Sequence, residues 1–213
     1  MISMKLNLRP EEQTDYRIVE ELTREAFWNI YVPGTDVHLL MHNLRNAKEF
    51  VKPLDFVAVY DDKIVGNIVY AEAKIKDGDK EHTILTFGPL SVLPEYQSMG
   101  IGGELINHTA KISKEMGYKA IIIYGDPEYY ERFGFKVSKK YKITNKDKKY
   151  PAALLVLELY PNALNGIEGI FDEGKAYEID GKEAEEFDKG FPEKEKAVTK
   201  TQERFLELAG KYL

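Results

Sequence analysis

Residues 85–103 read LTFGPLSVLPEYQSMGIGG, and this stretch contains both a strand and the start of a helix. Apolar and small residues dominate up to Leu93, a run of strand length, and Pro94 then lacks the amide donor that further pairing would need. Gly88 and Pro89 are poor strand-interior residues. We therefore expect a bulge at this pair that separates the strand from one neighbour and leaves backbone groups free.

The second half of the stretch places glycines at the start of a helix. A helical stripe predicts this helix over residues 103–116, ended by Gly117, with apolar or small residues at Leu105, Thr109, Ile112 and Met116. Unpaired amides and the positive end of the helix dipole meet at such a start, and glycines let a phosphate approach the backbone closely. We therefore expect a pyrophosphate to bind there.

Two other glycine-rich loops fit the sequence poorly. A dinucleotide-binding fingerprint needs a glycine where Leu105 stands, and a nucleotide-hydrolase phosphate loop needs a lysine that this chain lacks after its glycines. A tight strand-to-helix turn that uses glycine for geometry alone remains an alternative on this motif.

The whole string resembles the signature of the GNAT superfamily of N-acetyltransferases. In that signature a strand ends in apolar-Val-x-Pro-x-Tyr-Gln, and Q/R-x-x-G-x-G/A then opens a helix; the matching residues here are Val92, Pro94, Tyr96, Gln97, Gly100 and Gly102. A second signature, Tyr-x-x-x-Gly-Phe, is matched by Tyr130, Gly134 and Phe135. The resemblance covers about residues 4–160, and Gly125-Asp126-Pro127 with Tyr129-Tyr130 is similar to one bacterial subgroup of predicted acetyltransferases.

The resemblance implies an α/β (α+β) fold. The expected GNAT fold has a mixed, mostly antiparallel central sheet whose fourth and fifth strands are parallel and splayed, with helices on its faces. Residues 1–160 would form this domain. Residues 161–213 would form a helical C-terminal extension that packs on the domain or on a second subunit, because its apolar stripe is too thin to stand alone.

Periodicity along the chain agrees with this order of elements. Strands are expected at residues 5–9, 55–60, 64–73, 85–93 and 120–124, and an antiparallel pair at 135–138 and 152–160. Helices are expected from Thr14 or Asp15 onward, at 35–47, at 127–133 with Asp126 as N-cap, and at 194–211.

The resemblance also implies acetyl-CoA as the acyl donor. Its pyrophosphate would bind the backbone amides of Gln97, Ser98, Met99, Gly100, Ile101, Gly102 and Gly103. Its pantetheine arm would pair with the backbone of Leu90, Ser91 and Val92. One amide of these three residues could also face the oxyanion that develops on the thioester during acetyl transfer. Many relatives carry an arginine in this loop, whereas this chain has none there and has Glu104 after it.

Catalytic roles follow the same resemblance. Tyr130 is the expected general acid, because a phenol is protonated at neutral pH and can donate a proton to a departing thiolate. The sequence does not identify the base, and Glu25, Glu72, His82 and Asp126 are all candidates.

Two further clusters have more than one interpretation. Trp28, Ile30 and Tyr31 could be core or could wall a substrate pocket. His38 and His42 have the spacing of a helical zinc pair, but the carboxylate of the hydrolase pattern is missing, so we expect two partly exposed polar residues and no metal site.

Composition narrows the class of protein. The net charge of −6 argues against nucleic acid as a partner, and the lysines between Lys139 and Lys149 are expected in a solvated loop. There are no cysteines, no signal-like N-terminus and no apolar run of membrane-spanning length, so we expect a cytoplasmic protein with no membrane partner.

The expected function is transfer of acetyl from acetyl-CoA to a primary amine of a small molecule, by direct attack in a ternary complex. Acetylation of a protein lysine or N-terminus is an alternative, and a non-catalytic acyl-CoA-sensing module is another. A homodimer is possible by analogy with relatives.

Overall fold

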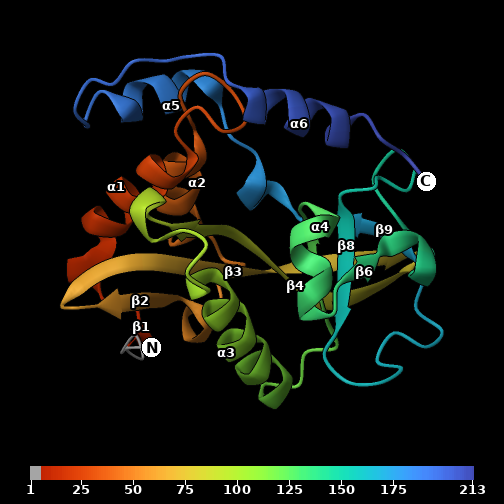
Figure 1. Ribbon diagram of the computed structural model, residues 1–213. Helices are drawn as coiled ribbons and strands as arrows, with labels where there is room; N and C mark the ends of the chain where they lie inside the picture. Colours follow the sequence, from red (N-terminus) through yellow and green to blue (C-terminus); the bar gives the residue numbers. More distant parts are fainter. Residues whose placement is uncertain (1–5) are drawn as a thin grey trace.

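The computed structural model describes residues 6–213, which form a twisted sheet with helices on both faces (Figure 1). Lys5, expected to begin the first strand, lies outside the described residues. The strands are β1 (Leu6–Pro10), β2 (Phe56–Tyr60), β3 (Lys63–Asp77), β4 (Lys80–Val92), β5 (Ala120–Tyr124), β6 (Lys136–Val137), β7 (Ile143–Thr144), β8 (Leu154–Glu158) and β9 (Gly169–Asp172). The α-helices are α1 (Tyr16–Phe27), α2 (Val37–Leu44), α3 (Ile101–Glu115), α4 (Pro127–Tyr130), α5 (Gly181–Asp188) and α6 (Lys200–Ala209).

The sheet has the strand order β1-β2-β3-β4-β5-β8-β6. Strands β1 to β4 are antiparallel neighbours, and β4 and β5 are parallel. The parallel pair is joined at one register position, Leu85 with Ile121, beyond which the two strands have no further pairing. The expected mixed sheet with splayed fourth and fifth strands is therefore confirmed.

The bulge expected in β4 is also present. Ile68 of β3 pairs with Leu90, whereas Tyr70, two residues later, pairs with Phe87, three residues earlier on β4, so β4 carries one extra residue at Gly88-Pro89. Since β4 pairs with β5 only at Leu85, the run of β4 beyond Leu85 has backbone groups on its β5 side that β5 does not pair.

Helix α3 covers one face of the sheet and helices α1 and α2 cover the other (Figure 1). On the α3 face, the hydroxyl of buried Tyr70 lies 2.8 Å from that of Thr109. On the other face, Val19 and Met41 pack against Val69. Successive strand residues thus point to opposite faces, and both faces are apolar because both are covered.

The chain after Tyr160 adds elements that the sequence analysis did not predict. Strand β9 pairs with β3 and with β7, and the acidic segment that follows forms α5, capped by Asp180, whose carboxylate accepts from the amides of Lys182 and Glu183. The last helix was expected over residues 194–211, which was wrong at its start, since α6 begins at Lys200. Helices α5 and α6 lie across the top of the view in Figure 1, over α1, α2 and α4.

The aromatic cluster after α1 holds this last segment. The indole of Trp28 donates to the carbonyl of Glu195 at 2.8 Å, and the rings of Tyr31 and Phe205 lie 4.8 Å apart. Trp28 is buried, whereas Tyr31 is 41% exposed. The cluster therefore docks the C-terminal segment onto α1, a role that neither interpretation from the sequence included.

The two histidines of α2 have different surroundings. His38, expected to be partly exposed, is fully buried against the rings of Phe187 and Phe191, and burial lowers its pKa to about 4. His42 contacts Glu20 at 2.8 Å. Within residues 6–213 no group of three or more potential ligands is arranged to hold a metal ion.

None of the helices in the described part of the chain is both long and apolar enough to cross a membrane.

Candidate active site

The glycine loop ends at the start of α3, as expected, but the helix begins at Ile101, two residues earlier than predicted. Gly100 is its N-cap with a φ of 88°, and Ser98 has a φ of 62°. The amide of Glu104 donates to the carbonyl of Gly100, so the amides before Glu104 belong to the first turn, which has no intrahelical acceptors for them. These amides and the helix dipole create a site that favours an anion.

A pocket of about 660 Å³ lies at this end of α3. It is bounded by α1, the end of β4, the glycine loop, α3 and the segment from α4 to Phe133. Its lining residues are Ala26, Phe27, Leu90, Val92, Tyr96, Gln97, Ser98, Gly100, Ile101, Gly102, Gly103, Glu104, Asn107, Tyr129, Tyr130, Arg132 and Phe133.

Most of the residues singled out from the sequence lie in this pocket. Those that line it are Leu90, Val92, Gln97, Ser98, Gly100, Ile101, Gly102, Gly103 and Tyr130. Ser91 and Met99 do not line it. The Ser91 side chain is buried on the opposite side, 3.0 Å from the hydroxyl of Thr23, and Met99 is 48% exposed.

The loop is tied to the strand before it through Gln97. The Gln97 side-chain amide donates to the carbonyl of Val92 at 3.0 Å, which holds the loop against the last residue of β4. The same end of β4 is the part that has separated from β5. The unpaired strand edge and the amides of α3 are therefore brought into one pocket.

The glycines of α3 also allow two aromatic side chains to approach closely. A Cβ atom at Gly102 would lie 2.6 Å from the hydroxyl oxygen of Tyr129, and one at Gly103 would lie 2.9 Å from a ring carbon of Phe133. Real Cβ atoms are not found this near to such atoms. A side chain at either position would therefore force the Tyr129 or the Phe133 ring to shift.

Tyr130 lies between the sheet and the pocket. Its ring packs against Phe87 and Phe135, at centroid distances of 6.0 and 5.5 Å, and a Cβ at Gly125 would overlap it at 2.3 Å. Burial, with smaller contributions from nearby tyrosines, raises the pKa of Tyr130 well above its usual range. The structure gives its hydroxyl no hydrogen-bond partner among residues 6–213, so the phenol is a protonated donor available to the pocket.

Tyr129 and Arg132 also line the pocket, although neither was assigned a role from the sequence. Burial raises the pKa of Tyr129, and the nearby charge of Arg132 opposes that rise. Arg132 donates from Nε to the Tyr129 carbonyl at 2.9 Å, and its guanidinium lies 4.8 Å from the Tyr129 ring centre. The signal that could have found Arg132 is its position two residues after Tyr130, within the second signature.

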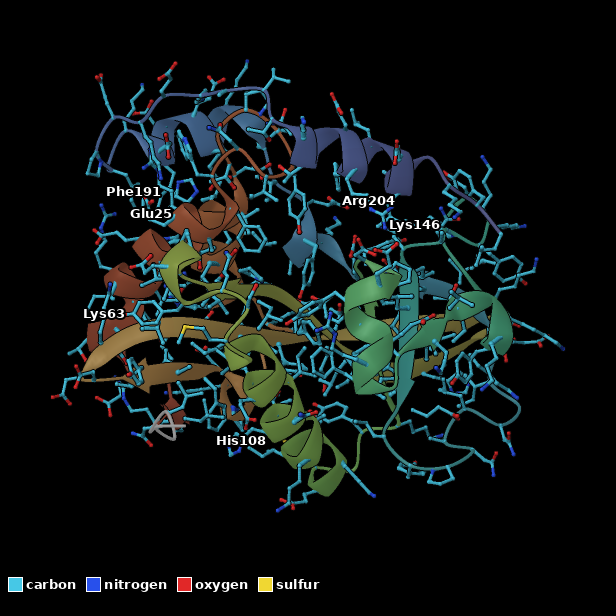
Figure 2. The ribbon with its side chains drawn as sticks, viewed as in Figure 1. Glu25, Lys63, His108, Lys146, Phe191 and Arg204 are labelled. Carbon is cyan, nitrogen blue, oxygen red and sulfur yellow. The ribbon has the colours of Figure 1, made fainter. Side chains whose placement is uncertain are left out.

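The four candidate bases do not line this pocket. Glu25 pairs with Lys194, and Asp126 caps α4 by accepting from the amide of Glu128 at 3.0 Å. Asp126 also lies 3.3 Å from Arg204 of α6. Figure 2 shows Arg204 above α4, where the C-terminal helix crosses it.

The remaining two candidates, Glu72 and His82, are together elsewhere. They line a different surface pocket with Tyr118, whose hydroxyl donates to Glu72 at 2.7 Å. This pocket lies near the end of α3 that is remote from the glycine loop.

The C-terminal segment contributes a side chain beside the β4 bulge. The Tyr177 hydroxyl donates to the carbonyl of Gly88 at 3.4 Å. Burial raises the pKa of Tyr177, and the carboxylate of Glu173 raises it further. Burial likewise raises the pKa of Glu173 itself. The sequence gave no sign of this contact, because 89 residues separate its partners.

Comparisons with known proteins agree with this geometry. Residues 54–137 match the family model of the acetyltransferase (GNAT) domain. The uncharacterized N-acetyltransferase YjhQ of Escherichia coli K12 is 35% identical over 99 residues, which are 46% of this chain and 51% of YjhQ. The chain thus spans about half the length of YjhQ. The uncharacterized N-acetyltransferase YhbS of the same organism is 27% identical over 134 residues, 62% of this chain and 78% of YhbS.

Solved structures with the same fold are similar over most of the chain. The crystal structure of Escherichia coli YhbS in complex with CoA has a TM-score of 0.73 at 22% identity, covering 83% of this chain and 94% of that one. A GNAT acetyltransferase from Brucella melitensis in complex with acetyl-CoA has a TM-score of 0.66 at 26% identity, covering 82% and 99%. The glycine loop and the unpaired edge of β4 thus lie in one pocket with Tyr130 of the second signature, and residues 54–137, which include all three, match the GNAT acetyltransferase domain.

Proposed function

We propose that this protein transfers the acetyl group of acetyl-CoA to a primary amine of a small molecule, by direct attack within a ternary complex. The observation that carries the proposal is one pocket that contains the first-turn amides of α3, the unpaired edge of β4 and the phenol of Tyr130. Bound acetyl-CoA would supply the activated acyl group.

The pocket fits such a donor in two respects. The backbone between Ser98 and Gly103 presents amides to a diphosphate, and the space beside Gly100 is open, with no atom within 4 Å of the position of a Cβ. The edge of β4 at Leu90 and Val92 offers backbone groups to an extended arm, as an added strand would use them. These residues would bind and orient the donor.

Tyr130 would provide the acid. Its raised pKa keeps the phenol protonated at neutral pH, which suits donation of a proton to a thiolate as it leaves. No residue among Glu25, Glu72, His82 and Asp126 lines the pocket, so none is proposed as a direct base.

The C-terminal segment favours a small acceptor. Tyr177 lies against the β4 bulge, and Arg204 joins α6 to Asp126 and Glu128 at the start of α4. These contacts place the C-terminal segment beside the β4 bulge and at the start of α4, and we infer that it restricts the room for a folded protein acceptor. The net charge of −6 also attracts a cationic amine.

The experiment is a thiol-release assay with acetyl-CoA over a panel of small amines and lysine-containing peptides, together with calorimetric titration of CoA. Saturable binding of CoA and release of thiol that depends on a small amine are the expected results. Release that depends on the peptides alone would replace the small-molecule assignment with the protein one. Binding of CoA without any acceptor-dependent thiol would favour a sensing module.

A further inference from the structure

The pocket at the start of α3 has two formally charged lining side chains, Arg132 and Glu104. Glu104 stands in the first turn of α3, where a diphosphate would bind. A diphosphate carries at least two negative charges, so Glu104 repels it. Without Arg132 the lining side chains would have a net negative charge, and the anion would depend on backbone amides alone.

Arg132 is held in a defined position. Its Nε donates to the carbonyl of Tyr129 at 2.9 Å, and its guanidinium carbon lies 4.8 Å from the centre of the Tyr129 ring. The hydroxyl of that ring lies against Gly102 in the first turn of α3. Arg132 is therefore stacked on a side chain that itself contacts the glycine loop.

The remaining donors of Arg132 are available. Nε is used by the Tyr129 carbonyl, whereas the two terminal nitrogens have no carboxylate within ion-pair distance among residues 6–213. Other arginines of this acidic protein do have such partners, among them Arg9, Arg24 and Arg45. Stacking on Tyr129 alone would explain the position of Arg132, but it would not explain an unpaired guanidinium that shares a pocket with the α3 amides.

We propose that Arg132 binds the diphosphate of coenzyme A and supplies the positive charge that the glycine loop lacks. The planar guanidinium can donate two parallel hydrogen bonds to phosphate oxygens, which suits a diphosphate better than a single ammonium does. The charge thus comes from the segment after α4, across the pocket from the loop itself. This assignment rests on the proposed function, because it presumes that CoA is the ligand.

Calorimetric titration of the purified chain with CoA tests the assignment. Arg132→Gln is expected to raise the Kd about tenfold, the scale of one lost charged hydrogen-bonding partner. Arg132→Lys should raise the Kd less, because the positive charge remains although the two parallel donors of the guanidinium are lost. Lys80→Gln removes one exposed charge from the distant β3–β4 hairpin and should leave the Kd unchanged. Because Arg132 is exposed, the unliganded melting temperature should stay the same.

Titrations with two CoA analogues identify which phosphate Arg132 contacts. With 3′-dephospho-CoA the penalty of Arg132→Gln should persist, and with pantetheine, which has no phosphate, it should vanish. Glu104→Gln should tighten CoA binding about threefold, since it removes a like charge from the same site.

The outcomes separate this inference from the proposed function. Failure of the wild-type protein to bind CoA would refute both. Normal binding by wild type and an equal Kd for Arg132→Gln would refute the role of Arg132 alone. A penalty that disappears with 3′-dephospho-CoA would overturn the diphosphate assignment, because Arg132 would then bind the 3′-phosphate.

Discussion

The hydroxyl oxygen of Tyr129 lies 2.6 Å from the position that a Cβ atom would occupy at Gly102. The segment after β5 is therefore packed onto the first turn of α3 through a contact that only glycine permits. The next nearest atom of that ring is 3.9 Å away, so the hydroxyl is the group in conflict. This contact couples the second family signature to the first.

A substitution at Gly102 is the first prediction. Gly102→Ala should lower the melting temperature by about 5 °C, because overpacking of this kind costs about 2 kcal/mol. The double variant Gly102→Ala with Tyr129→Phe should recover most of that loss, since it removes the oxygen that meets the new methyl group. Equal melting temperatures for the single and the double variant would show that the hydroxyl is not the obstacle. Tyr129→Phe alone is the matched control.

The second prediction concerns the proton donor. Tyr130→Phe should lower kcat by at least about tenfold while leaving the Kd for CoA unchanged, because the ring remains and the acid is lost. Because the pKa of Tyr130 is raised, its phenol should stay protonated up to at least about pH 10, the ordinary pKa of a phenol. Wild-type kcat should therefore not fall through ionisation of Tyr130 below that pH. Tyr129→Phe should have a smaller effect on kcat. Unchanged turnover in Tyr130→Phe would remove this residue from the mechanism.

The sequence predicted the parts of the site that depend on local geometry. The glycine loop, the bulge at Gly88-Pro89 and the cap at Asp126 each follow from the backbone preferences of a few adjacent residues. The buried apolar run of β5 was equally clear. These features need no knowledge of distant contacts.

The C-terminal segment could not be predicted in the same way. Strand β9 has four residues and pairs with Lys74, Ile75 and Lys76, almost a hundred positions earlier in the chain. Helix α5 is acidic, with one buried residue, Ala184, so its sequence shows no apolar stripe. Tertiary contacts determine both elements. For the same reason the sequence could not place Tyr177 beside Gly88.

A third prediction follows from a buried carboxyl pair. Burial, together with a hydrogen bond and the charge of Glu11, raises the pKa of Asp55 far above its usual range. Asp55 is 3% exposed, and Arg45 forms ion pairs with Glu11 and Glu20 but none with Asp55. The folded protein therefore retains a proton that the unfolded chain releases above about pH 3.9. The contribution of Asp55 to stability is therefore fully present below that pH and is lost as the pH rises toward its folded pKa of about 9.

Asp55→Asn tests this dependence. The amide needs no proton, so the variant should be more stable than wild type at pH 8 and should lose the decline between pH 5 and pH 8. Urea denaturation across that range measures how the free energy of unfolding changes with pH in wild type and in the variant. Asp79→Asn, at an exposed hairpin turn, should behave like wild type. Parallel pH profiles of unfolding free energy for wild type and Asp55→Asn would contradict the conclusion that folded Asp55 retains its proton.

The fourth prediction concerns the docking of the C-terminal segment on α1 and α2. Asp188 of α5 accepts two hydrogen bonds from Arg24, at 2.6 and 3.2 Å, and lies 3.0 Å from Nε2 of His38. Burial opposes ionisation of Asp188, but the hydrogen bond and charge of Arg24 outweigh it, and its pKa is lowered. The Arg24 side chain is 4% exposed, so it depends on this carboxylate for compensation.

Asp188→Asn should therefore cost about 3 kcal/mol of stability, the scale for a buried charge left without its partner. It should also make the chain around residues 189–199 more sensitive to limited proteolysis, because the segment is less firmly held. Glu185→Gln, on the exposed side of the same helix, should change neither property. Wild type should approach the variant on strong acidification, because Asp188 then gains a proton and no longer differs in charge from an asparagine. Its lowered pKa means that its contribution to stability is present above the unfolded carboxyl pKa of about 3.9 and is lost as the pH falls below that value. Identical proteolysis of wild type and Asp188→Asn at neutral pH would mean that the segment is held by its aromatic contacts alone.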